Sequence, residues 1–181
     1  FSARVRRKIC DDKVDADGWL AVHRTAHQLG FKSNCTMLYG TVETLEERVD
    51  HLVRLRALQD ETQGFQAFIP LAYHPENNRL GNIGAPTGAD DLRTIAVSRL
   101  MLDNIPHIKA YWVMLGIKTA QLAQIFGAND LDGTVTEEKI YHMAGSETPN
   151  ALTVQDLHEL IRAIGRVPQE RTTTYEEISS S

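Results

Sequence analysis

Polar and aromatic residues follow the end of a short apolar run in the first third of the chain, a place where a ligand could be held. Tyr39, Gly40, Thr41 and Glu43 complete the run that begins at Lys32. A glycine at position 40 would let a ligand approach the backbone, and the Glu43 carboxylate could accept hydrogen bonds from a ribose or an amine. Equally, Glu43 could cap the next helix, whose dipole favours a negative charge.

A second polar group follows the apolar run 64–72. Its members are His74, Glu76, Asn77 and Arg79. Arg79 could bind a carboxylate through two parallel hydrogen bonds. The segment from His74 to Gly84 is a long predicted loop, and long loops of barrels are often functional. Ordinary polarity of an exposed loop explains the same residues equally well.

Position alone singles out Tyr111, Trp112 and Asp132. Tyr111 and Trp112 are adjacent in a predicted strand, 108–115, and neighbouring strand side chains face opposite sides, so only one could point into a site. Asp132 lies in a fourth predicted strand, 129–135, where it could hold a ligand hydroxyl or simply a loop. No Ser-His-Asp arrangement or phosphate-binding P-loop is recognisable in the sequence.

Helical patterns separate these apolar runs. Strands are predicted at 32–39, 64–72, 108–115 and 129–135, and helices at 15–29, 44–61, 87–103, 118–126 and 153–164. This alternation is typical of a β/α barrel, in which the C-terminal ends of the strands form the reactive face. We therefore expect an α/β fold with about four β/α units of a TIM-type barrel, and the polar residues above at one mouth.

Length and composition limit the function classes. The 181 residues are too few for a complete barrel, which needs roughly 250, and suffice for a single unit 1–181 ending in a helix at about 152–165. The segment 1–10 shows no helix cap or leading strand, so we interpret the chain as a fragment. A net charge of -5 gives no support to nucleic-acid binding, and no apolar run approaches a membrane span. A cytoplasmic location is the default expectation.

Cysteine is scarce in this chain. Cys10 and Cys35 are its two cysteines, and neither belongs to a CxxC pair. A metal site made of cysteines alone is therefore excluded within the chain, and we predict no metal ligands in it.

Several segments resemble one family of enzymes when they are read together. The segments are HRTAHQLGFKSNCTMLYGTVET, GFQAFIPLAYHPENN, TGADDLRTIAVSRLMLDNIPHIKAYWVMLG, FGANDLDGTVTEEKIYHMAG and IRAIGRVPQERTTTYEEI. They are similar to the C-terminal half of the aminofutalosine synthases, radical S-adenosylmethionine (SAM) enzymes of the futalosine route to menaquinone. The resemblance implies that the chain is the C-terminal portion of a radical SAM barrel.

The same resemblance implies the cofactors and the reaction. S-adenosylmethionine would be cleaved to methionine and a 5′-deoxyadenosyl radical, which adds to 3-[(1-carboxyvinyl)oxy]benzoate; aryl migration and loss of a carboxylate then give aminofutalosine. The family's CxxxCxxC motif, which holds a 4Fe-4S cluster, does not occur here, so its ligands are expected upstream of this chain. An electron donor must reduce the cluster, and the fragment alone is expected to be inactive.

Site roles also follow from the resemblance. Tyr39, Gly40, Thr41 and Glu43 match a glycine and glutamate motif that lies along S-adenosylmethionine in related enzymes. His74, Glu76, Asn77, Arg79, Tyr111, Trp112 and Asp132 become candidates for substrate binding. The resemblance identifies no catalytic residue.

Two alternatives remain open at this stage. The chain could belong to the related dehypoxanthine futalosine cyclase or to the deazaflavin-forming branch. It could instead be a cluster-free half barrel that binds a ligand or pairs with a second copy. An open half barrel exposes strand edges and apolar interior, so we expect either a homodimer or a missing N-terminal half.

Overall fold

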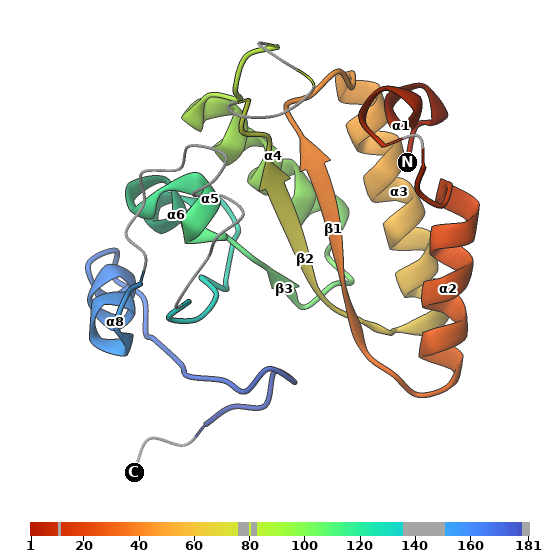
Figure 1. Cartoon of the computed structure of the whole chain (residues 1–181). Helices are drawn as coiled ribbons and strands as arrows, with labels where there is room; N and C mark the ends of the chain where they lie inside the picture. The colour runs from red at the N-terminus through yellow and green to blue at the C-terminus, as the bar shows by residue number, and fades with distance from the viewer. Residues whose placement is uncertain (11, 76–79, 81–82, 136–150, 179–181) are drawn as a thin grey trace.

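A parallel three-stranded sheet in the order β1-β2-β3 forms the centre of the computed structural model, which describes residues 1–10, 12–75, 80, 83–135 and 151–178. The strands are β1 (Ser33–Tyr39), β2 (Phe65–Ala72) and β3 (His107–Ile108). β1 pairs with β2 from Ser33–Phe65 to Tyr39–Ala72, with an irregularity after Ser33. Because the strands are parallel, their C-terminal ends lie at one edge of the sheet (Figure 1).

Helices connect these strands and flank them. They are α1 (Ala3–Ile9), α2 (Ala16–Gln28), α3 (Leu45–Thr62), α4 (Gly88–Met101), α5 (Trp112–Leu115), α6 (Ile117–Ala123) and α8 (Val154–Arg162). Figure 1 shows α4, which follows β2, behind the sheet, and α3, which follows β1, alongside β1. This β-α-β-α-β order confirms the predicted alternation for the first two units.

Capping residues fix where three of the helices begin. Thr44, Thr87 and Thr153 each accept a hydrogen bond from the backbone amide three residues later, and the acidic residue at that position bonds back to the threonine amide. These capping boxes satisfy amides that an isolated helix end leaves unpaired. The predicted starts near 44, 87 and 153 are thus confirmed.

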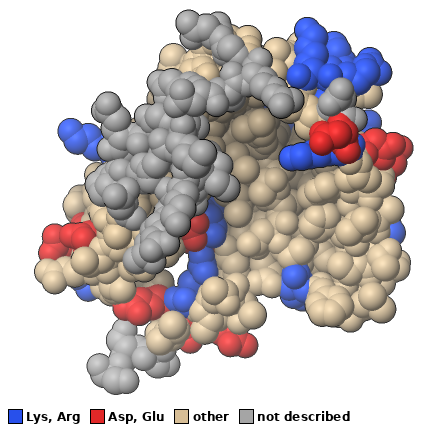
Figure 2. Space-filling model, viewed as in Figure 1, with Lys and Arg blue, Asp and Glu red and all other residues tan. Residues whose placement is uncertain are grey.

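The hydrophobic core lies between the sheet and the two connecting helices. Cys35, Met37 and Tyr39 of β1 are buried against it, together with Leu55 of α3 and Ile95 of α4. The alternate β1 residues are exposed. Asn34, Thr36 and Leu38 carry this second face, here called the inner face. Figure 2 shows the molecule from this side, with an extended surface free of charged side chains right of centre.

The third and fourth predicted strands are largely wrong. Only His107–Ile108 pairs with β2, and residues from Trp112 onward form the helical turn α5. The run 108–115 is apolar almost throughout, and such a run does not distinguish a strand from a buried helix. In place of a strand at 129–135 the described residues show one bridge, Lys109–Asp130, and Asp132 has a left-handed φ of 74°.

The expectation that residues 1–10 lack a helix cap is wrong, because the Ser2 hydroxyl accepts a hydrogen bond from Val5 N at the start of α1. Within the described ranges, no helix combines the length and hydropathy needed to cross a bilayer.

Candidate functional site

The turn after β1, residues 40–43, is built around the Glu43 carboxylate and is called the Glu43 turn below. Glu43 Oε1 accepts hydrogen bonds from Gly40 N at 2.5 Å and Arg48 Nε at 2.8 Å. Oε2 accepts from Thr41 N at 2.8 Å and from the Thr41 hydroxyl at 2.6 Å. A carboxylate offers about four acceptor positions, so these donors occupy the group. Glu43 therefore fixes the shape of its own turn.

This arrangement separates Glu43 from the neighbouring helix cap. Thr44, not Glu43, caps α3. Burial acts to raise the pKa of the Glu43 carboxyl, but hydrogen bonds from the Thr41 hydroxyl and the Gly40 amide, with the Arg48 charge, outweigh it and leave the pKa below its usual value. The carboxylate thus stays ionised and keeps its four donors in the neutral pH range.

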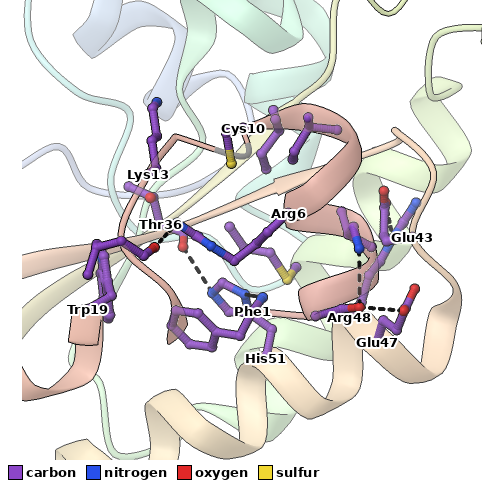
Figure 3. Close-up of a pocket in the computed structure, with 16 residues that line it drawn as sticks. Phe1, Arg6, Cys10, Lys13, Trp19, Thr36, Glu43, Glu47, Arg48 and His51 are labelled. Atoms are coloured by element: carbon purple, nitrogen blue, oxygen red, sulfur yellow. Dashed lines mark hydrogen bonds and ion pairs between the residues drawn. The ribbon is translucent and has the colours of Figure 1, made fainter. Parts of the chain in front are cut away.

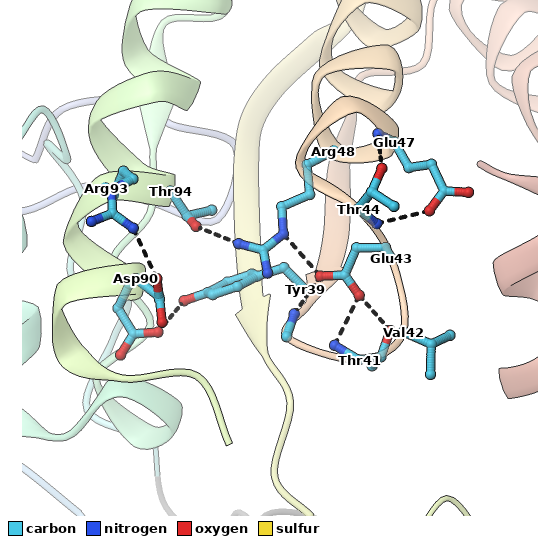
Figure 4. A network of polar contacts seen from close by, with 12 residues as sticks. Tyr39, Thr41, Val42, Glu43, Thr44, Glu47, Arg48, Asp90, Arg93 and Thr94 are labelled. Atoms are coloured by element: carbon cyan, nitrogen blue, oxygen red, sulfur yellow. Dashed lines mark hydrogen bonds and ion pairs between the residues drawn. The ribbon is translucent and has the colours of Figure 1, made fainter. Parts of the chain in front are cut away.

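Arg48 joins the Glu43 turn to α4. Its Nη1 donates to the Thr94 hydroxyl at 3.2 Å while Nε holds Glu43. Its guanidinium also lies 5.2 Å from the centre of the Tyr39 ring. Figure 4 shows Arg48 between Thr94 and Glu43, across the end of β1. The turn after β1 and the first half of α4 are therefore connected through one side chain.

A buried hydrogen bond lies under this network. The Tyr39 hydroxyl donates to Asp91 Oδ1 at 2.6 Å, and Tyr39 is fully buried. Burial raises the pKa of the Asp91 carboxyl, and the Tyr39 hydrogen bond opposes that shift. The pKa of Tyr39 is itself raised, first by burial and then by the Asp91 charge. Tyr39 supports the Glu43 turn from beneath, where its hydroxyl is already committed to Asp91.

Gly40 has a positive φ of 84° and lies against Pro86, in the segment that leads into α4. A Cβ atom at position 40 would stand 2.7 Å from Pro86 Cγ, which real contacts essentially never show. Both the backbone conformation and the close approach therefore require glycine.

A cavity of about 440 Å³ opens beside the Glu43 turn. This volume is within the range of small-molecule sites. Residues from α1, α2, β1 and α3 line it, and Figure 3 shows Glu43, Glu47 and Arg48 together at one end with Trp19 at the other. His51 and Phe1 lie between these ends, with their rings stacked at 3.8 Å. The cavity places ionic groups and aromatic rings around one space.

The second predicted group is described only at His74. The residue follows β2, and its Nε2 lies 3.1 Å from the carbonyl oxygen of Met114, so it contacts the segment after β3. Glu76, Asn77 and Arg79 lie outside the described residues. Their predicted role in binding substrate stays a prediction.

The third predicted group, Tyr111, Trp112 and Asp132, is split between the start of α5 and the loop that follows Asp130. Tyr111 precedes α5 and Trp112 begins it, so the expectation that they occupy adjacent strand positions is wrong. Trp112 is buried, and its indole nitrogen donates to the carbonyl of Gly133 at 3.1 Å. Asp132 Oδ1 accepts a hydrogen bond from Lys109 Nζ at 3.0 Å. Asp132 therefore belongs to a charged cluster after β3.

The residues present do not fit an iron-sulfur cluster. Cys35 is buried, and burial raises the pKa of its thiol; Cys10, the other cysteine, is partly buried. Within the described ranges, no group of three or more His, Cys, Asp or Glu side chains is placed to hold a metal ion. The Glu43 turn, by contrast, suits a polar organic ligand, because Glu43, Glu47 and Arg48 line a cavity of adequate size beside it.

The residues predicted from the sequence do not include Arg48, Asp91 and Lys109, which take part in these networks. Arg48 and Asp91 lie on helices, among other charged residues that face solvent, and nothing in their spacing distinguishes them. Lys109 carried a usable signal, because it is a single charge within the apolar run from Ile108 to Leu115. A buried charge in such a run requires a partner.

Comparisons with known proteins agree on one group of relatives. Residues 62–180 match the family described as the CofH/MqnC C-terminal region. The chain is 56% identical to an aminodeoxyfutalosine synthase of Thermus thermophilus, over 98% of this chain and 49% of that protein. It is 50% identical to the aminodeoxyfutalosine synthase of Streptomyces coelicolor, over 97% of this chain and 48% of that protein.

A relative with a different name is more distant. The 5-amino-6-(D-ribitylamino)uracil–L-tyrosine 4-hydroxyphenyl transferase of Methanoculleus marisnigri is 43% identical, over 94% of this chain and 48% of that protein. The chain spans about half the length of the curated relatives that it matches.

Proposed function

Because the chain belongs to the family described as the CofH/MqnC C-terminal region, we propose that it forms the C-terminal part of an aminodeoxyfutalosine synthase, a radical SAM enzyme of menaquinone biosynthesis. The observation that carries this proposal is the identity of 56% over 98% of the chain to a protein of that name. The parallel β-α-β-α-β arrangement supports the proposed barrel origin, because a β/α barrel repeats this unit.

S-adenosylmethionine, when bound and reductively cleaved, supplies a 5′-deoxyadenosyl radical for addition to 3-[(1-carboxyvinyl)oxy]benzoate. The protein's task in such chemistry is to orient the two ligands and exclude water. We assign S-adenosylmethionine to the Glu43 turn, where Gly40 and Thr41 present backbone and Glu43 holds their conformation. Tyr39 supports this turn from the buried side through Asp91.

The substrate side of the proposed site comprises His74 and Tyr111 among the described residues, and Glu76, Asn77 and Arg79 outside them; Asp132 borders this side through its ion pair with Lys109. Trp112 has a packing role, because its ring is buried and its indole nitrogen is bonded to Gly133. We assign no cluster ligand to this chain, so the reducing partner and the thiolates of a 4Fe-4S cluster belong to the proposed whole enzyme.

Product analysis of the whole enzyme tests the function. The full-length protein is purified without oxygen and incubated with S-adenosylmethionine, a reductant and 3-[(1-carboxyvinyl)oxy]benzoate. We expect aminofutalosine and methionine. The alternatives are tested in separate incubations that contain their own substrates: dehypoxanthine futalosine for cyclisation, or tyrosine and 5-amino-6-(D-ribitylamino)uracil for transfer of the 4-hydroxyphenyl group. Either product in place of aminofutalosine would assign the enzyme to that branch.

The role of the Glu43 turn is tested by Glu43→Ala in the same enzyme. The variant leaves the Gly40 and Thr41 amides without their acceptor, and hydrogen bonds to a charged group contribute about 1.5–3 kcal/mol. We expect the Kd for S-adenosylmethionine to rise about tenfold or more, measured by calorimetry. Glu61→Ala is the matched control, because Glu61 pairs with Arg24 on the outer surface. Unchanged affinity in Glu43→Ala would remove the turn from the cofactor site.

A further inference from the structure

Lys109 points to the inner face of the sheet. Its backbone amide donates to the carbonyl of Phe68 at 2.9 Å, so it continues the line of β3 beside β2. Ile108 and Ala110, on either side, are fully buried in the core. Because successive side chains of an extended strand alternate, Lys109 lies on the opposite side, the one that Thr36 shares. The lysine is nevertheless only 6% exposed.

Asp130 already has its own cation. Its Oδ2 accepts hydrogen bonds from Arg171 at 2.7 Å and from the Tyr175 hydroxyl at 2.9 Å. Lys109 Nζ lies farther from this carboxylate, at 3.9 Å. Arg171 also lies over the Tyr175 ring, 4.1 Å from its centre. The C-terminal segment thus neutralises Asp130 and leaves Lys109 to be balanced mainly by Asp132.

Asp132 is the accessible member of the cluster. Its side chain is 29% exposed, compared with 8% for Lys109 and 6% for Asp130. It holds Lys109 at 3.0 Å from a backbone position with a left-handed φ of 74°, a conformation that few residues other than glycine adopt. The carboxylate that pairs with the buried ammonium therefore sits on a loop at the cluster's solvent side.

From this arrangement we propose that Lys109 binds a carboxylate of a ligand on the inner face, and that Asp132 occupies the same position when no ligand is bound. The inference rests on the proposed function, since both S-adenosylmethionine and 3-[(1-carboxyvinyl)oxy]benzoate carry carboxylates. An ammonium in a mostly buried position binds an anion more strongly than one in water, because its field is less screened. Asp132 competes with the ligand for the Lys109 ammonium. When no ligand is bound, Asp132 pairs with Lys109 and so avoids the free-energy cost of a buried, unpaired charge.

Binding measurements on the full-length enzyme test this proposal. Lys109→Met removes the charge and keeps a side chain of similar length, and Lys118→Met on α6 is the exposed control. We expect Lys109→Met to weaken binding of 3-[(1-carboxyvinyl)oxy]benzoate or of S-adenosylmethionine about 10- to 100-fold, the range for a charged hydrogen bond. Which of the two Kd values rises identifies the source of the carboxylate.

Asp132→Asn distinguishes ligand binding from a structural ion pair. Asparagine keeps the acceptor for the Gly133 amide but removes the competing charge. The ligand whose binding is weakened in Lys109→Met should bind to the Asp132→Asn variant at least as tightly as to the wild type. Equal weakening in both variants, or unchanged Kd values in Lys109→Met, would overturn the proposal.

Esters of the benzoate substrate provide the second readout. The wild type should prefer the free acid to the ester at the recognised carboxylate, and Lys109→Met should lose that preference if the substrate is the source. Binding is measured separately from turnover, so a wild type that binds normally but makes another product refutes the proposed function and leaves the Lys109 assignment standing. If the wild type yields aminofutalosine but Lys109→Met binds both ligands with unchanged Kd values, only the role proposed for Lys109 is refuted.

Discussion

His51 on α3 makes the stability of this fold depend on pH. The side chain is 9% exposed, and its Nε2 lies 3.1 Å from the carbonyl oxygen of Thr36. The pKa of His51 is lowered to about 3, and burial of the imidazole is the largest cause. The imidazole is therefore neutral in the folded state throughout the mildly acidic range.

The sign and size of the effect follow from linkage. In the unfolded chain the histidine pKa is about 6.5, so the unfolded state takes up a proton as the pH falls below that value, whereas the folded state does not. The stability is present above pH 6.5 and is lost as the pH falls toward 3. Each pH unit below 6.5 costs about 1.4 kcal/mol, so lowering the pH from 7 to 5 removes about 2 kcal/mol through this one group.

Urea unfolding at pH 7 and pH 5 measures this loss, with the fluorescence of Trp19 and Trp112 as the signal and the protein kept dilute. Other histidines contribute as well, because burial lowers the pKa of His23 and His27. The informative quantity is therefore the difference between the wild type and His51→Gln, in which the glutamine amide can still donate to Thr36. The pH-dependent loss should be about 2 kcal/mol smaller in His51→Gln. An equal loss in both proteins would refute the reasoning, and His158→Gln on α8 is the control.

The remaining predictions concern stability and association. Gln59 is 2% exposed, accepts a hydrogen bond from Phe65 N and donates to the carbonyl oxygens of Phe65 and Asn104. Gln59→Leu should therefore lower the free energy of unfolding by about 3 kcal/mol, roughly 1 kcal/mol per bond. Gln155→Leu on α8 is the control and should change it little, so equal urea midpoints for the two variants would contradict the prediction. The chain on its own should dimerise or aggregate, because β1 is an edge strand and Leu38 is exposed on the inner face; size-exclusion chromatography that shows a stable monomer with native-like melting would refute this.

The sequence predicts the elements whose residues carry local signals. β1 alternates between buried and exposed residues, and Thr44 and Thr87 are followed by acidic residues at the capping distance. The strand predicted at 108–115 fails, because all its residues except Lys109 are apolar or aromatic and the backbone instead turns into α5 at Trp112. Local pattern does not decide such a segment; the packing of its surroundings does.

The candidate site is predictable from the sequence only where its residues carry local signals. The Glu43 turn is predictable as a place because it follows a strand and contains a glycine, but its partners are not. Arg48 reaches Thr94, which is 46 residues away, and Tyr39 reaches Asp91, 52 residues away. Contacts between residues so far apart depend on how the helices pack on the sheet, so spacing alone does not reveal them.

The missing side chain at Gly40 has a mechanical consequence. The pyrrolidine ring of Pro86 fills the place where a Cβ atom would stand, so the backbone at position 40 and the stretch that enters α4 cannot shift independently. Arg48 also links the Glu43 turn to the body of α4, because it bonds both Glu43 and Thr94. Any molecule that presses on the backbone at Gly40 must therefore push α4 as well, and a spectroscopic label near the start of that helix would report its arrival.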